Sequence, residues 1–158
     1  VVFLSVVGSE ERGGPIGTSL LNQAEADAVV AAVVALLSGD VTASQVGIVT
    51  PYAAQQQLIA QGEQLTDAVI ADIQLSAVES FQGGERDYVC VSFVRSASPR
   101  LGFVADARRL CVALTRARRG LFMVGNHATL AAHSVLFGRM LYNYSLRGLL
   151  VEAVGDRF

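Results

Sequence analysis

Three polar segments interrupt the apolar runs of this 158-residue chain, and each carries residues that could bind an anion. The first segment is Thr50-Pro51-Tyr52, which directly follows the apolar run 46–49. A threonine at a helix N-cap, with proline at the first helical position, would leave backbone N–H groups directed at a phosphodiester. A plain helix cap without a ligand explains the same residues.

The second segment covers residues 78–87, with the sequence Val-Glu-Ser-Phe-Gln-Gly-Gly-Glu-Arg-Asp. The paired glycines Gly83 and Gly84 permit positive φ angles and a close approach of the backbone to a ligand. Glu85 could accept a hydrogen bond from a ribose hydroxyl. A surface turn stabilised by an exposed Glu–Arg pair is the alternative.

The third segment covers residues 106–119 and holds five of the twelve basic residues, all of which are arginines. Arg109 and Arg116 are seven positions apart, so on a helix they would project together along one edge of its apolar stripe. That placement favours a guanidinium directed at a fixed anion. A salt bridge within the domain is the alternative. The stripe consists of Leu110, Ala113, Leu114 and Ala117.

The elements needed to hold these segments alternate between apolar strands and amphipathic helices. Asn22, followed by Glu25, resembles a capping box at the start of the first helix. The alternation predicts a three-layer α/β fold, with a mainly parallel sheet covered by helices on both faces. Ligands of such sheets bind at the carboxyl ends of the strands, which points to the segments that start at Thr50, Glu79 and Val94. The expected strands are residues 1–7, 46–50, 73–78, 88–93 and 120–124, and the expected later helices are residues 53–65, 105–117 and 128–146.

Composition restricts the function classes. A net charge of −2 argues against an autonomous nucleic-acid-binding domain with a broad basic face. No apolar run reaches the roughly 18 residues that a membrane span needs. Cys90 and Cys111 lie in apolar runs without metal-ligand spacing, so we expect buried free thiols and no metal site. One domain is expected over residues 1–158, truncated at its N-terminal side because the chain begins with Val1.

In this order, the three segments together resemble the last motifs of the superfamily 1 helicases of subfamily B, and most closely those of the nonsense-mediated-decay helicases. The stretch 17–26 is also similar to the region that precedes these motifs in that group. The likeness implies the second, C-terminal RecA-like domain, a P-loop NTPase-type fold without the P-loop. Residues 47–52 with Gln55 resemble motif IVa, residues 78–87 motif V, residues 108–118 motif VI, and residues 120–126 the strand that follows.

The resemblance also implies a nucleotide site shared with a partner, the first RecA-like domain of the same chain. Arg116 matches the arginine finger that reaches the γ-phosphate of ATP held on that domain, where it would stabilise the transferring phosphoryl group. Gln82, Gly83 and Glu85 match motif V positions that meet the nucleotide, Glu85 through the ribose. The full-length protein would use ATP and Mg²⁺.

A nucleic-acid track is the other implication of the resemblance. Thr50, Pro51, Tyr52 and Ser80 match positions that contact the backbone of single-stranded RNA or DNA. Phosphate contacts of this kind would make binding independent of sequence. We also expect a cytoplasmic or nuclear location, since no export signal is visible and the thiols look reduced.

The sequence lacks the GxxxxGKS or GxxxxGKT phosphate loop and the acidic Mg²⁺ motif of these enzymes. We therefore expect this chain to bind neither ATP nor Mg²⁺ alone and not to hydrolyse ATP by itself. The alternative is a non-catalytic α/β interaction module derived from a helicase domain. A dinucleotide oxidoreductase is disfavoured, because no GxGxxG follows a strand.

Overall fold

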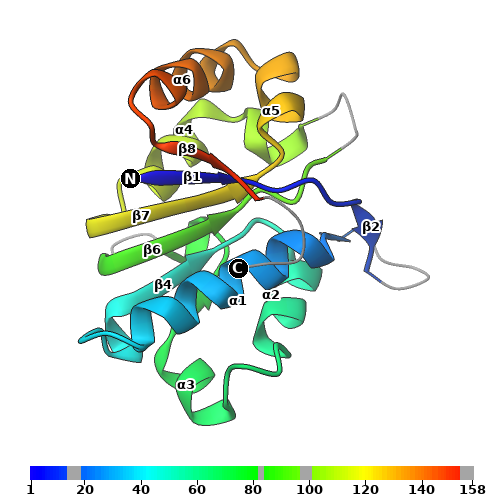
Figure 1. The fold of residues 1–158 in the computed structure, drawn as a ribbon. Coiled ribbons are helices and arrows are strands. Elements are labelled where there is room, and N and C mark those ends of the chain that lie inside the picture. Colours follow the sequence, from blue (N-terminus) through cyan, green and yellow to red (C-terminus); the bar gives the residue numbers. More distant parts are fainter. Residues whose placement is uncertain (14–18, 82–83, 97–100, 154–158) are drawn as a thin grey trace.

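A six-stranded parallel sheet forms the centre of the molecule (Figure 1). The structure is a computed structural model that describes residues 1–13, 19–81, 84–96 and 101–153. Every strand pair in this sheet is parallel, in the order β5-β4-β6-β7-β1-β8. Its strands are β1 (Val2–Ser5), β4 (Val46–Val49), β5 (Gln74–Ser76), β6 (Arg86–Ser92), β7 (Ala117–Gly125) and β8 (Leu150–Glu152). A short antiparallel pair, β2 (Glu11–Arg12) with β3 (Leu20–Leu21), lies outside it.

Helices cover both faces of the sheet, which confirms the expected three-layer, RecA-like α/β fold (Figure 1). One face carries α1 (Gln23–Leu37), α2 (Ala53–Ala60) and α3 (Asp67–Asp72), and the other carries α4 (Ala107–Leu114), α5 (His127–His133) and α6 (Val135–Leu146). Three single-turn helices complete the described elements: η1 (Ala43–Gln45), η2 (Glu79–Phe81) and η3 (Gly102–Ala105). Within the described ranges, no helix is long and apolar enough to span a bilayer.

Two hydrophobic cores lie on opposite faces of the sheet, because successive residues of a strand point to opposite sides. On the α1 face, Ile48 and Cys90 pack with Val33 of α1. On the α4 face, the neighbouring strand residues Val49 and Val91 pack in a second cluster, together with Leu110 of α4, Leu130 of α5 and Phe137 of α6. Both faces of the central strands are therefore buried, which explains why those strands appear in the sequence as continuous apolar runs.

Several expected element boundaries are wrong. The helix expected at 53–65 ends at Ala60, because the chain turns at Gly62, where a side chain would lie 2.9 Å from Val30 Cγ2. The helix expected at 128–146 is divided by Ser134, whose hydroxyl caps α6. The helix expected at 105–117 covers only 107–114. The sheet has a sixth strand, β8, that we did not predict. Cys111 is exposed on α4 rather than buried, whereas Cys90 is buried as expected.

Candidate nucleotide and nucleic-acid sites

The candidate residues lie at two opposite edges of the sheet. Arg86 pairs with Ala117 at the amino ends of β6 and β7, so Glu85 and Arg116 lie at the amino-terminal edge. Thr50 directly follows β4 and lies at the carboxyl-terminal edge with Tyr52. The seven residues of β6 separate the two groups by about 20 Å, at roughly 3.3 Å per residue. The other candidate nucleotide-binding residues, Gln82 and Gly83, lie outside the described residues.

Arg116 follows the end of α4 rather than lying on it. Because α4 ends at Leu114, the expected helical edge shared by Arg109 and Arg116 is wrong. The Arg116 side chain is half-buried, and its Nε donates to the Val112 carbonyl at 2.9 Å while Nη2 donates to Thr115 Oγ1 at 3.2 Å. Among the described residues, no carboxylate lies within ion-pair distance of it. Two internal acceptors thus hold a guanidinium whose charge no described carboxylate neutralises.

Glu85 is ion-paired at the same edge. Its Oε2 lies 3.0 Å from Nε of Arg118, and these side chains are 49% and 62% exposed. Arg119 makes a similar contact with Asp87, at 3.5 Å. The sequence analysis gave an exposed Glu–Arg pair as the alternative to a ligand contact at this turn, and Glu85 forms such a pair with Arg118. Such exposed pairs contribute at most about 1 kcal/mol, so this one would not prevent Glu85 from accepting a hydrogen bond from a ligand.

The Thr50–Tyr52 segment does not form the expected helix cap. The N-cap of α2 is Tyr52, whose side chain makes no capping hydrogen bond, so Thr50 is not the cap and Pro51 is not the first helical residue. Thr50 is fully buried, whereas Pro51 and Tyr52 are half-buried. The N–H of Ala54 donates to Ser19 Oγ at 3.0 Å. Only part of this segment therefore reaches the surface, and its first turn has fewer free donors than the sequence suggested.

Ser80 is exposed on η2, where two contacts fix its position. Glu79 Oε1 lies 3.2 Å from Nε of Arg109, which links η2 to the beginning of α4. The next residue, Phe81, is fully buried and contacts β4, since a side chain at Gly47 would lie 2.5 Å from its Cζ. The Ser80 hydroxyl therefore lies between the buried Phe81 side chain and the ion pair that Glu79 makes at the surface.

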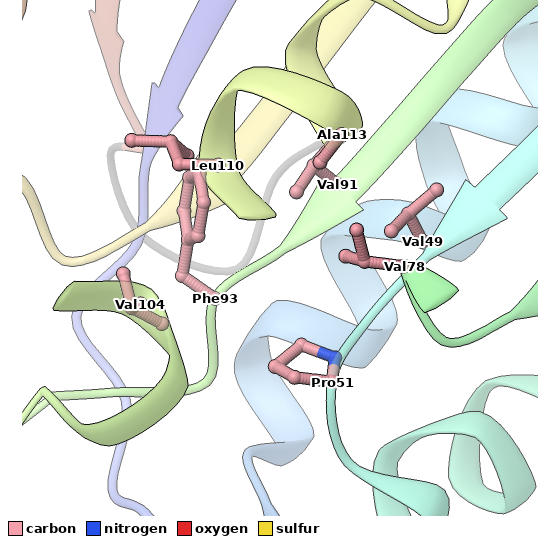
Figure 2. A pocket seen from close by; sticks show the side chains of 8 residues that line it. All are labelled: Val49, Pro51, Val78, Val91, Phe93, Val104, Leu110 and Ala113. Carbon is pink, nitrogen blue, oxygen red and sulfur yellow. The ribbon is translucent and has the colours of Figure 1, made fainter. Parts of the chain in front are cut away.

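A small apolar pocket lies where the three polar segments meet (Figure 2). Pro51 comes from the first segment, Val78 from the second and Leu110 from the third. The pocket is lined by apolar side chains alone, so it suits packing between the segments rather than binding of a nucleotide. The complete lining is Val49, Pro51, Val78, Val91, Phe93, Val104, Leu110 and Ala113.

A buried carboxyl group near the carboxyl end of β6 escaped the sequence analysis. Glu25 is fully buried, and its Oε2 accepts hydrogen bonds from Ser92 Oγ at 2.8 Å and from the Val94 N–H at 2.7 Å. Burial raises the pKa of Glu25 to about 7, although the hydrogen bonds from Val94 and Ser92 act to lower it. No local signal reveals these partners, because they lie 67 and 69 residues away in the chain.

The expected capping box at α1 is only half formed. Asn22 Oδ1 accepts from the Glu25 N–H at 3.2 Å, as expected. The second bond of a capping box would run from the Asn22 N–H to the Glu25 side chain. Here the Asn22 N–H donates instead to Gln55 Oε1, at 2.8 Å. Gln55 also donates to Ser92 Oγ at 3.1 Å. Gln55 thus takes the capping role expected of Glu25, and this leaves Glu25 for its contacts with Ser92 and Val94.

Arg95 connects this buried region to the candidate nucleic-acid segment. Its side chain is nearly buried, and its Nε lies 3.5 Å from Glu10 Oε2. It is also a neighbour of the Tyr52 phenol, whose pKa it affects. Burial raises the pKa of Tyr52, while the charge of Arg95 lowers it. Tyr52 therefore has a fixed cationic neighbour at the carboxyl edge of the sheet.

Known proteins match the chain over nearly its whole length. The AAA domain family matches residues 1–128. The chain is 38% identical to ATP-dependent helicase upf1 of Schizosaccharomyces pombe, covering 96% of the chain and 17% of that protein. It is 39% identical to the Regulator of nonsense transcripts 1 homolog of Arabidopsis thaliana, covering 96% and 12%. For ATP-dependent helicase NAM7 of Saccharomyces cerevisiae the identity is 35%, covering 99% and 16%.

The chain spans less than a fifth of the length of these curated relatives. The resemblance seen in the three polar segments nevertheless extends over almost the entire chain. Together with the parallel, helix-covered sheet, the matches confirm the expected relationship: the chain belongs to the AAA domain family and is similar to the regulator of nonsense transcripts 1 helicases.

Proposed function

We propose that this chain is the C-terminal half of the motor of an ATP-dependent RNA or DNA helicase. In this proposal a first RecA-like domain holds ATP and Mg²⁺, and the present chain completes the nucleotide site at its amino-terminal edge. The names of the similar proteins support the proposal, since two of them are ATP-dependent helicases. The order of the three polar segments supports it independently.

The proposal rests on the contacts of the Arg116 side chain, which differ from those of the other four arginines in its segment. Arg109, Arg118 and Arg119 are paired with carboxylates. In the described part of the chain, Arg108 and Arg116 have no such partner, and of these two only the Arg116 side chain is held by internal hydrogen bonds. A cation that is oriented in advance and not neutralised is what stabilisation of a transferring phosphoryl group requires.

The remaining proposed contacts divide between the two edges of the sheet. Glu85, with Gln82 and Gly83, would contact the nucleotide, Glu85 by accepting from a ribose hydroxyl. Pro51, Tyr52 and the exposed Ser80 would contact single-stranded RNA or DNA. Thr50 is fully buried, so its contribution to binding would be indirect, through the residues that cover it. Contacts to the nucleic-acid backbone would give binding that weakens with salt and does not depend on sequence.

The substitution Arg116→Ala in the full-length protein tests the proposal. We expect the ATP turnover rate to fall by about 10³–10⁵-fold, as for other arginine fingers. Affinity for a single-stranded oligonucleotide without nucleotide should stay within about twofold of wild type, because Arg116 and Tyr52 lie at opposite edges of the sheet. Steady-state ATPase assays and fluorescence anisotropy measure the two effects.

The matched control for this experiment is Arg108→Ala, which removes an exposed guanidinium from α4 that has no carboxylate partner among the described residues. Its turnover should remain near that of wild type. If Arg116→Ala also retains near-normal turnover, the arginine-finger role is wrong, and the non-catalytic interaction module becomes the better description.

A further inference from the structure

Val94 has a backbone conformation that valine rarely adopts. Its φ is 69°, and no other non-glycine residue in the described ranges has a positive φ. In this left-handed region the branched side chain crowds the backbone, so the conformation persists only where surrounding contacts hold it. Val94 lies two residues beyond the end of β6 and is fully buried. The strain is therefore located at the carboxyl edge of the sheet, next to the candidate nucleic-acid segment.

Buried side chains from distant segments hold this turn. Glu25 Oε2 accepts from the Val94 N–H at 2.7 Å. Asn22 Nδ2 donates to the Val94 carbonyl at 3.3 Å and to Ser96 Oγ at 2.7 Å. Glu10 Oε2 accepts from the Ser96 N–H at 3.2 Å. The bond to Glu25 is the shortest of those made by the strained residue.

The direction of the turn decides where Arg95 points. Arg95 lies between the two residues that these side chains hold, and its own side chain is only 9% exposed. From there its positive charge acts on the Tyr52 phenol. A change in the Val94 backbone would rotate the next residue, and Tyr52 would then lose its cationic neighbour. A continuous series of contacts thus runs from Glu25 through Val94 and Arg95 to Tyr52.

We propose that Glu25 is a positioning residue for nucleic-acid binding, because it holds the left-handed turn at Val94 that places Arg95 against Tyr52. The inference rests on the proposed function in one respect, namely that Tyr52 belongs to the nucleic-acid track. Glu25 itself is fully buried, so nucleic acid at the surface would not reach it. Its substitution therefore affects binding through Tyr52.

A double-substitution cycle in the full-length protein tests this inference. The dissociation constants of fluorescein-labelled 15-nucleotide uridine and thymidine oligomers are measured without nucleotide for wild type, Glu25→Ala, Tyr52→Ala and the double variant. Tyr52→Ala should weaken binding by about tenfold, as for the loss of one hydrogen bond to a charged phosphate. Glu25→Ala should weaken it by about threefold or more. The double variant should bind no more weakly than Tyr52→Ala, because Glu25 acts through Tyr52.

Two further variants separate positioning from simple loss of stability. Val33→Ala removes a fully buried side chain from the same helix without touching the turn, so it should lower the melting temperature but leave the oligomer affinity unchanged. Glu25→Gln keeps an oxygen that can accept from the Val94 N–H, so it should recover most of the affinity lost in Glu25→Ala. Circular dichroism confirms that each variant is folded at the assay temperature. If Glu25→Ala is unfolded, Glu25→Met carries the test, because methionine fills a similar volume but offers no oxygen to the Val94 N–H.

The outcomes distinguish the inference from the proposed function. If Tyr52→Ala weakens binding while Glu25→Ala, or Glu25→Met in its place, binds like wild type, the positioning role is wrong and the nucleic-acid track remains. Equal losses for Glu25→Ala and Val33→Ala, or a double variant whose loss is the product of the two single losses, would also overturn the positioning role. If Tyr52→Ala binds like wild type, the track assignment itself fails, and the inference fails with it.

Discussion

The buried carboxyl group of Glu25 should make the stability of this domain depend on pH. Desolvation raises its pKa from 4.5 to about 7, against the hydrogen bonds from Val94 and Ser92, and nearby Glu10 raises it slightly further. Between these two values the folded state binds more protons than the unfolded state, so the free energy of unfolding falls as pH rises. At 1.36 kcal/mol per pKa unit, the loss from about pH 4 to about pH 8 is about 3 kcal/mol.

Urea unfolding of wild type and of Glu25→Gln, at several pH values between about 4 and 8, measures this loss. The glutamine side chain has nearly the shape of the protonated acid but does not titrate. The difference in unfolding free energy, variant minus wild type, should therefore increase by about 3 kcal/mol over this range, while effects of all other groups cancel. The exposed Glu63→Gln serves as the control for removing a carboxylate that is not buried. A Glu25→Gln difference that stays flat, or decreases with pH, would refute the assignment of a desolvated carboxyl group.

Two further predictions concern the thiols and the packing of η2. Burial raises the pKa of the Cys90 thiol to about 12, while Cys111 is exposed, so a disulfide reagent at pH 8 should modify one thiol quickly and the second only on unfolding. Rapid modification of both thiols in the native protein would contradict this. Gly47→Ala should destabilise the protein by about 1–3 kcal/mol, because the new Cβ would lie 2.5 Å from Phe81 Cζ. Gly39→Ala, whose nearest contact is an ordinary 3.5 Å, should change stability by less than about 0.5 kcal/mol in the same urea titration.

The central strands could be predicted from the sequence because burial on both faces leaves a direct mark. All four residues of β4 are buried, so the run Val46–Val49 is apolar throughout. β8 leaves no such mark, because its three residues are at most half-buried and pair with β1 through the backbone. Backbone pairing does not depend on side-chain type, so a short edge strand of this kind is not visible in a hydrophobic pattern.

The end of α4 illustrates how long-range pairing overrides a local helical pattern. Residues up to Ala117 continue the apolar spacing, which is why the helix was expected to extend that far. In the structure the Arg116 carbonyl accepts from the Arg86 N–H at 3.1 Å, and β7 begins at the next residue. A hydrogen bond to a strand thirty residues earlier thus fixes the boundary. The sequence indicated Arg116 as a candidate, but its orientation depends on this pairing.

The sequence did not predict that the candidate residues divide between two edges of the sheet. The rule that ligands bind at carboxyl ends of strands fits Thr50 and Val94, which follow β4 and β6. Glu85 and Arg116 precede β6 and β7 and lie at the other edge. The segment that contains Glu85 starts after β5 and returns along the sheet before β6 begins. Spacing in the sequence contains no information about that return path.

This division restricts how the two proposed sites could communicate. A separation of about 20 Å exceeds the screening length of roughly 8–10 Å in physiological salt, so charges at the two edges do not influence each other directly. Coupling must then pass through packed elements that contact both edges. α4 meets this requirement, since its Ala113 lines the apolar pocket beside Pro51 while its Val112 carbonyl holds the Arg116 guanidinium at 2.9 Å. A shift of this two-turn helix would therefore move the cation and the packing of the nucleic-acid segment together, which makes α4 a physical connection between them.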